Sequence, residues 1–148
     1  MPSLPKLGIA NMSAPLGNRT PHAVGAGYFY RTNNMNKVAC SVFGEGAASE
    51  GDIHASMNFA STLNTQSMFF VRNNVNAIST FIEDQYAGDG ISSRGEGYGM
   101  PSIKVDGMDI FAVYNAVKIG REMVMKNKIP VLIEAFTYRF GDHSTSDS

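Results

Sequence analysis

The chain has 148 residues, of which 43% are hydrophobic and 17% charged, a balance typical of a globular protein with one ordinary core. Its formal net charge is −1 and its 12 Lys and Arg residues are scattered, which argues against nucleic acid as a partner. No apolar run approaches the ~20 residues that span a bilayer, and the first residues resemble neither a signal peptide nor an Arg-rich presequence, so no membrane association is expected.

The amino-terminal part predicts an extended segment followed by a helix. Residues 1–19 show no hydrophobic periodicity and contain three of the six prolines, as expected of an extended leading segment. Thr20 followed by Pro21 is typical of a helix start with Thr20 as the N-cap, and this helix is expected to end near Arg31. Gly25-Ala26-Gly27 weakens the helix, which indicates that another backbone or a ligand approaches it closely.

Two apolar, β-branched runs predict buried strands. The runs 37–43 and 67–72 lack clean alternation, as expected of strands covered on both faces. Cys40 lies in the first run and is expected to be a small buried residue. As the single cysteine, it cannot form a disulfide framework within the chain. Residues 52–63 between the two runs are predicted to be helical.

The second half continues the alternation of strands and helices. After a long loop, a short strand is expected at 102–105, followed by a helix capped by Asp109 that ends before Pro130 and by a buried strand at 130–136. Helical connections of this kind indicate parallel pairing, so residues 20–148 are predicted to form one α/β domain with a doubly wound parallel sheet.

The loop after the first strand carries one acid between two glycines. Ligands of doubly wound sheets bind beyond the carboxyl ends of the strands, which is where Gly44-Glu45-Gly46 begins. Backbone N–H groups in such a turn can bind a phosphate. A carboxylate repels a phosphate, but it can hold a divalent cation that the phosphate also binds. The loop therefore predicts part of a metal and diphosphate site.

The loop after the second strand supplies the complementary groups. Arg72 can pair with phosphate oxygens, and an Asn side-chain carbonyl of the Asn73-Asn74 pair suits a hard cation such as Mg²⁺. Residues 47–72 separate the two loops, an interval that fits one helical crossover between neighbouring parallel strands. A second acid-glycine turn, Gly88-Asp89-Gly90, has no Asn pair at this interval and is rejected.

A Gly-acid-Gly turn followed at this interval by Asn-Asn resembles the thiamin diphosphate motif of transketolase-like and 2-oxo acid decarboxylating enzymes. From about Ser13 onward the sequence resembles, more specifically, branched-chain 2-oxo acid dehydrogenase alpha subunits. Pyruvate-specific relatives usually carry Asp in the first loop, so pyruvate is the less favoured substrate. The similar stretches are GEGAASEGD (44–52), FFVRNN (69–74), AIST (77–80), YAGDGI (86–91), VDGMDIFAVYNAVK (105–118) and YRFGDHSTSD (138–147).

The resemblance implies a thiamin diphosphate-binding fold, represented by its central portion and incomplete at both ends. Mg²⁺ would be held by side-chain oxygens of Glu45 and Asn74 and by the backbone carbonyl of Asn76. His143 would contact the diphosphate and take part in catalysis, and Leu16 would pack near the aminopyrimidine. The residues implied to bind the cofactor are Leu16, Gly46, Ala47, Arg72, Asn74 and His143.

The implied activity is oxidative decarboxylation of branched-chain 2-oxo acids, with acyl transfer to a lipoyl group. In this family a beta subunit supplies the activating glutamate, so an α₂β₂ assembly is implied, with a lipoyl-bearing acyltransferase as the next component. Ser144 matches a regulatory phosphorylation site, which implies a kinase and a phosphatase as further partners. The expected location is the mitochondrial matrix in a eukaryote and the cytoplasm otherwise.

The chain departs from its relatives at two places. Val75-Asn76 stands where relatives tend to have Gly-Tyr, which places a β-branched residue in the turn of the metal site. Relatives bind K⁺ with oxygens of a segment that matches Ser13 and Pro15, but Arg19 replaces an uncharged residue there and argues against K⁺. Three hypotheses follow: a catalytic alpha subunit represented by a fragment, a non-catalytic paralogue kept as a binding or regulatory subunit, and a pyruvate dehydrogenase alpha subunit.

Overall fold

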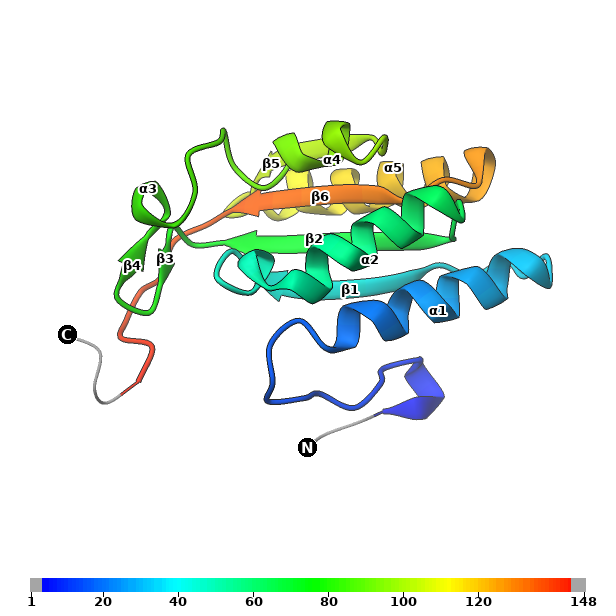
Figure 1. The fold of residues 1–148 in the computed structure, drawn as a ribbon, viewed down its shortest axis with the longest axis horizontal. Helices are drawn as coiled ribbons and strands as arrows, with labels where there is room; N and C mark the ends of the chain where they lie inside the picture. Colours follow the sequence, from blue (N-terminus) through cyan, green and yellow to red (C-terminus); the bar gives the residue numbers. More distant parts are fainter. Residues whose placement is uncertain (1–3, 145–148) are drawn as a thin grey trace.

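Four parallel strands form the centre of the molecule in the computed structural model, which describes residues 4–144. Their order across the sheet is β1 (Ala39–Gly44), β2 (Ser67–Asn73), β6 (Val131–Phe136) and β5 (Ser102–Asp106). All three neighbouring pairs are parallel, so the carboxyl ends of the strands lie at one edge of the sheet (Figure 1). The predicted parallel α/β sheet is confirmed.

Helices cover both faces of this sheet. The helices α1 (Arg19–Thr32), α2 (Gly51–Thr62) and α4 (Ser93–Gly97) lie on one face, and α5 (Ile110–Asn127) lies on the other (Figure 1). Two hydrophobic clusters correspond to these two layers. The first consists of Val24, Ala48, Ile53, Met57, Ala60, Phe69, Val71, Ile91, Met100 and Leu132. The second consists of Met68, Ala116, Val124, Val131 and Ile133.

The helix ends differ in how they are capped. Asp109 accepts hydrogen bonds from the backbone N–H groups of Phe111 and Ala112 at 2.8 and 3.1 Å, which confirms it as the N-cap of α5. Thr20 was expected to cap α1, and this was wrong, because the helix begins at Arg19 and the Thr20 hydroxyl is buried against that of Ser41, 2.9 Å away. A side chain that points into the sheet cannot cap its own helix.

The two glycines of α1 have different surroundings. A Cβ atom on Gly27 would collide with the Ser67 hydroxyl and would lie 2.9 Å from the Gln66 carbonyl oxygen. The Gly27 carbonyl in turn accepts a hydrogen bond from Gln66 N–H at 3.1 Å. A Cβ on Gly25 would meet nothing within 4 Å. The predicted close approach is therefore confirmed at Gly27 and is wrong at Gly25.

The edge strand β1 is covered on a single face. Helix α5 packs on β5, β6 and β2, and the helices of the other layer cover the inner face of β1. On the opposite face of β1, Cys40 is exposed and Val42 is 68% exposed. The predictions of a strand covered on both faces and of a buried Cys40 are wrong, because no described helix reaches β1 from the α5 side.

The segment between β2 and β5 is more structured than the predicted long loop. It contains a short antiparallel hairpin, β3 (Asn76–Ala77) and β4 (Thr80–Phe81), then α3 (Ile82–Gln85) and α4. The hairpin lies beyond the carboxyl ends of β2 and β6 (Figure 1). Two short 3-10 helices, η1 (Pro5–Leu7) and η2 (Ala47–Ser49), complete the described elements. Within residues 4–144, no helix has the length and apolar character needed to cross a membrane.

Candidate cofactor and metal site

The acid loop (Gly44-Glu45-Gly46) and the asparagine loop (Asn73-Asn74) begin side by side. Gly44 at the end of β1 is in register with Arg72 near the end of β2. Beyond these positions, the backbone N–H of Asn74 donates a hydrogen bond to Oε2 of Glu45 at 3.1 Å. Glu45 is 2% exposed, so its carboxylate is held inside the contact between the loops. The structure thus brings Glu45 and Asn74 together, as their spacing predicts.

Gly46 allows the acid loop to pack tightly on the hairpin. A Cβ atom at this position would lie 2.9 Å from the Cβ of Ala77. The 3-10 helix that follows begins at Ala47, which is 6% exposed, and is closed by hydrogen bonds from Ser49 N to Gly46 O and from Glu50 N to Ala47 O. The absence of a side chain on Gly46 therefore permits the close approach of the acid loop to the hairpin.

The turn at residues 74–76 combines amide oxygens with an unusual backbone conformation. Asn74 Oδ1 accepts a hydrogen bond from Asn76 N–H at 3.2 Å. Val75 has φ +64°, a left-handed conformation that is disfavoured for a β-branched residue. Asn76 Oδ1 is buried and has no hydrogen-bond partner among the described residues. A buried oxygen without a hydrogen-bond donor is available to coordinate a cation.

A cavity of about 350 Å³ lies between this turn and the carboxyl-terminal segment. Residues 138–142 form its other wall, where the rings of Tyr138 and Phe140 pack edge to face with centroids 5.3 Å apart. The segment is fixed by hydrogen bonds from Thr137 N–H to Asn73 O and from Arg139 to Ile78 O, at 2.8 and 3.3 Å. His143 and Ser144 follow the wall directly and are exposed.

Arg72 occupies a different environment from the other predicted residues. Asn73 is fully buried on the face of the sheet covered by α1 and α2, whereas Arg72 is exposed. Side chains alternate along a strand, so Arg72 points to the opposite face of β2. None of the described contacts joins the Arg72 side chain to Glu45 or Asn74.

The segment before α1 reaches the acid loop from the other side. A Cβ on Gly17 would lie 3.1 Å from the Cβ of Glu50, and the neighbouring Leu16 is 62% exposed. Asn18 donates a hydrogen bond from Nδ2 to Ser13 Oγ at 3.0 Å, and its Oδ1 is buried without a hydrogen-bond partner among residues 4–144. The exposed Arg19 guanidinium contacts the His22 ring at 3.3 Å.

Three residues of the site were not identified from the sequence. Glu134 of β6 is fully buried, and its Oε1 accepts a hydrogen bond from Asn73 Nδ2 at 2.8 Å. Tyr86 also accepts from Asn73 Nδ2, at 3.2 Å, and burial is the main cause that raises the pKa of its hydroxyl. Arg94 donates to Ala48 O at 2.5 Å and stacks over the Tyr86 ring. Only Glu134 left a signal in the sequence, an acid within the apolar run 131–136.

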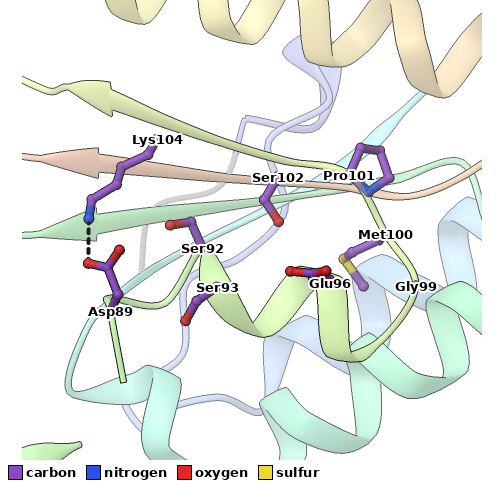
Figure 2. A pocket seen from close by; sticks show the side chains of 9 residues that line it. All are labelled: Asp89, Ser92, Ser93, Glu96, Gly99, Met100, Pro101, Ser102 and Lys104. Carbon is purple, nitrogen blue, oxygen red and sulfur yellow. Dashed lines mark hydrogen bonds and ion pairs between the residues drawn. The ribbon is translucent and has the colours of Figure 1, made fainter. Parts of the chain in front are cut away.

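A second cavity of about 520 Å³ lies between α4 and β5 (Figure 2). Its mouth carries the ion pair between Lys104 and Asp89, whose atoms are 3.0 Å apart. The hydrogen bond to Asp89 is the main cause that raises the pKa of Lys104. None of the residues predicted to bind cofactor or metal lines this cavity. The rejected turn Gly88-Asp89-Gly90 contributes to this wall and not to the loops at Glu45 and Asn74.

Comparison with known proteins agrees with this geometry. A transketolase structure from Campylobacter jejuni superimposes with a TM-score of 0.73 at 22% identity, covering 92% of this chain and 22% of that one. A structure from Mycobacterium smegmatis, described as a thiamin diphosphate-dependent enzyme, superimposes with a TM-score of 0.64 at 20% identity, covering 88% of this chain and 24% of that one. The chain thus has the α/β fold of these enzymes. The model of the dehydrogenase E1 component family matches residues 3–148, and the chain belongs to that family.

Similar proteins within the family are described as alpha subunits of 2-oxoisovalerate dehydrogenase. The mitochondrial 2-oxoisovalerate dehydrogenase subunit alpha of Homo sapiens is 57% identical over 136 residues, which cover 92% of this chain and 31% of the human protein. The corresponding protein of Dictyostelium discoideum is 52% identical over 143 residues, covering 96% of this chain and 32% of its own length. The chain therefore spans about a third of the length of these relatives. The predicted resemblance to branched-chain alpha subunits is confirmed.

Proposed function

We propose that this chain is the central part of a catalytic alpha subunit of branched-chain 2-oxo acid dehydrogenase. The whole protein would decarboxylate branched-chain 2-oxo acids oxidatively and transfer the acyl group to a lipoyl group. The 57% identity to a 2-oxoisovalerate dehydrogenase subunit supports this substrate class over pyruvate. The observation that carries the proposal is the hydrogen bond between Asn74 and Glu45, because it joins an acid loop and an amide loop at the edge of the sheet where ligands bind.

The donor set at this edge fits Mg²⁺. Magnesium prefers oxygen ligands, commonly one or two carboxylates together with substrate phosphates and water. The side chains of Glu45 and Asn74 and the backbone carbonyl of Asn76 would supply the protein ligands. The buried Oδ1 of Asn76, which has no partner among the described residues, supports a cation near this turn.

Thiamin diphosphate is the proposed organic cofactor. The fold shared with a Mycobacterium smegmatis protein described as thiamin diphosphate-dependent supports this cofactor. When bound, the cofactor supplies the electron sink for the loss of carbon dioxide. The backbone of Gly46 and Ala47, the Arg72 guanidinium and the His143 ring would bind the diphosphate.

Two further residues would act beside the reacting groups. Leu16 is apolar and exposed, and it lies next to the Gly17 contact with Glu50, which supports a role in covering the aminopyrimidine. His143 follows the cavity wall that faces Asn74, so it is suited to hold or deliver a proton there. Ser144 adjoins it, and phosphorylation would add negative charge next to the diphosphate site.

The proposed partners follow from the family and from the exposed surface. A beta subunit would complete the site as an α₂β₂ assembly, and a lipoyl-bearing acyltransferase, a kinase and a phosphatase would act on it. Large aromatic side chains are exposed at the start of α5, Phe111 (77%) and Tyr114 (66%), and after β6, Phe140 (84%), and such exposure supports contact with a partner protein. The relatives are mitochondrial, which supports the mitochondrial matrix as the location in a eukaryote.

A K⁺ site at Ser13 and Pro15 is a smaller part of the proposal. The buried Oδ1 of Asn18 has no described partner and lies in the same side chain that binds Ser13, which supports a monovalent cation. Arg19, whose guanidinium contacts the His22 ring, keeps its positive charge and would oppose such an ion. Dependence of thermal stability on K⁺, compared with Na⁺, tests this site.

One observation favours a non-catalytic subunit as the second candidate. Val75 holds a left-handed conformation in the metal turn, and a strained turn weakens a metal site if binding requires the backbone to move. A subunit of this kind would bind its partner without decarboxylation. Turnover of 3-methyl-2-oxobutanoate by the full-length protein with its partner would exclude this alternative, and comparison with pyruvate would settle the substrate.

The test of the metal site removes its two side-chain ligands one at a time. Glu45→Gln and Asn74→Ala in the full-length protein should each weaken Mg²⁺-dependent binding of thiamin diphosphate, measured by calorimetry. Glu96→Gln removes an exposed carboxylate from the wall of the second cavity and is the matched control. Wild-type binding by both site variants would contradict the assignment.

A further inference from the structure

Glu134 is a carboxylate fully buried at the centre of the sheet. It lies near the carboxyl end of β6, between β2 and β5, in register with Val71 and Lys104. Its described hydrogen-bond donors are all uncharged: Asn73 Nδ2 at 2.8 Å and Ile91 N at 2.9 Å on Oε1, and Ser92 N at 2.7 Å on Oε2. A buried carboxylate is costly without such donors, and an apolar side chain would fill this place more simply.

These donors make Glu134 the common contact of three segments. The turn before α4 is built around it, because a Cβ on Gly90 would lie 2.7 Å from Glu134 Oε2 and Gly90 has φ +75°. The same turn leads to Arg94, which donates to the carbonyl oxygen of Ala48 in η2, directly after the acid loop. Glu134 is therefore linked to the asparagine loop directly and to the acid loop through α4.

The bond to Asn73 fixes which way that amide faces. Because Nδ2 points to Glu134 and to the Tyr86 hydroxyl, Oδ1 must point the other way, where it accepts the backbone N–H of Val75 at 2.9 Å. That bond holds Val75 in its left-handed conformation. The turn so formed directs the N–H of Asn74 to Glu45 and that of Asn76 to Asn74 Oδ1.

We propose that Glu134 is a positioning residue for the metal-binding turn, acting through the side chain of Asn73. This inference rests on the proposed function of Glu45 and Asn74 as metal ligands. Glu134 itself would touch neither metal nor cofactor. Its carboxylate orients Asn73, and Asn73 sets the backbone on which Asn74 and Asn76 present their oxygens.

The test reverses the direction of one hydrogen bond. Glu134→Gln places an amide where the carboxylate accepts from Asn73, and Asn73→Asp places two carboxylates together. In the double variant, the amide introduced on β6 can donate to the carboxylate introduced on β2, whose other oxygen still accepts from Val75. The amide nitrogen cannot accept from Ile91 N–H as the carboxylate oxygen does, so that bond is lost. Each single variant should weaken Mn²⁺ binding, followed by electron paramagnetic resonance with thiamin diphosphate present, by about 10- to 100-fold, as expected for residues behind metal ligands. The double variant should recover at least part of this loss.

Amide hydrogen exchange of residues 74–76 in the full-length protein, without added cofactor, is the second readout. Exchange should be faster in both single variants and slower again in the double variant. Glu96→Gln is the control for loss of a carboxylate elsewhere. If a single variant does not fold, the double variant is compared with Tyr86→Phe, which removes only the second partner of Asn73. Binding by the double variant at the level of Tyr86→Phe or above supports the role, and binding well below that level contradicts it.

The outcomes separate this inference from the proposed function. Wild-type Mn²⁺ affinity and wild-type exchange at residues 74–76 in Glu134→Gln would overturn the positioning role. Failure of the wild-type protein to bind Mn²⁺ with thiamin diphosphate would instead refute the metal site. In that case, faster exchange in Glu134→Gln would show that Glu134 sets the turn but that the turn does not bind a metal.

Discussion

Asn74 donates its backbone N–H to the buried carboxylate of Glu45, 3.1 Å away, across the carboxyl ends of two neighbouring strands. This bond involves only the backbone of Asn74. Its side chain is oriented by a different contact, the hydrogen bond that Oδ1 accepts from Asn76 N–H. Backbone and side chain are thus set separately. Substitutions of the Asn74 side chain can consequently remove an oxygen without detaching the loop from Glu45.

The two glycines of α1 should respond in opposite ways to alanine. Gly27→Ala is expected to destabilise the fold by about 2 kcal/mol, because the added methyl group meets the Ser67 hydroxyl and the Gln66 backbone. Gly25→Ala places the same methyl group in open space and should stabilise the helix by roughly 0.5–1 kcal/mol. Urea unfolding of both variants checks this pair, and equal effects would contradict the packing described for Gly27.

Val75→Gly should stabilise the protein by about 1 kcal/mol, because glycine adopts a positive φ without the steric cost borne by valine. The matched control is Val113→Gly in α5, where the backbone is helical and glycine should destabilise by about 1 kcal/mol or more. Chemical unfolding measures both values. Loss of stability in both variants would mean that the Val75 side chain contributes more through packing than its conformation costs.

His54 should contribute to the pH dependence of stability. Burial first, and the nearby Arg94 charge second, lower the pKa of its imidazole, whose Nδ1 lies 2.7 Å from the Tyr98 hydroxyl. The folded state therefore favours the neutral ring, and this contribution, present above the ordinary histidine pKa, is lost as pH falls through the folded value. His54→Gln should show a smaller fall in melting temperature between pH 7 and pH 5 than the wild type.

Tyr98→Phe is the comparison variant for this effect. It removes the hydrogen bond but keeps the burial of His54 and its distance from Arg94. The pH dependence of the melting temperature should persist in Tyr98→Phe. Its disappearance there would assign the effect to the hydroxyl and not to burial.

Cys40 should react slowly with alkylating reagents although its side chain reaches solvent. Neighbouring protein atoms desolvate its thiolate and raise the pKa from 9.0 to about 11. Since the thiolate is the reactive form, the raised pKa lowers its population at neutral pH and slows the reaction. Iodoacetamide labelling of native and urea-unfolded protein measures the difference, with Cys40→Ser as the blank. Equal rates in both states would contradict the shift.

Local patterns in the sequence predicted the parts of the fold that depend on local chemistry. The β-branched runs gave β1 and β2 to within two residues at each end, and the Asp109 cap was recognised because its partners lie two and three residues away. The meeting of Glu45 and Asn74 was also predictable, because the interval between them fits one crossover in a parallel sheet.

Contacts between distant segments were not predictable in the same way. The role of Glu134 depends on Asn73, 61 positions away, and on Ser92, 42 positions away, so no local pattern reveals it. Thr20 failed as a cap because Ser41, on a separate element, holds its hydroxyl. The exposure of Cys40 depends on which strands α5 covers, and an apolar run alone carries no information about that.

The uncovered face of β1 has a consequence for handling the 148-residue chain by itself. Among the described residues, β1 pairs only with β2, so one row of its backbone groups faces outward next to the exposed Val42. Unprotected apolar strand edges recruit further strands and lead to aggregation. Preparations of the isolated chain should therefore associate progressively in light scattering. Val42→Lys should keep the protein monomeric, because a charge beside the open edge opposes pairing with further strands.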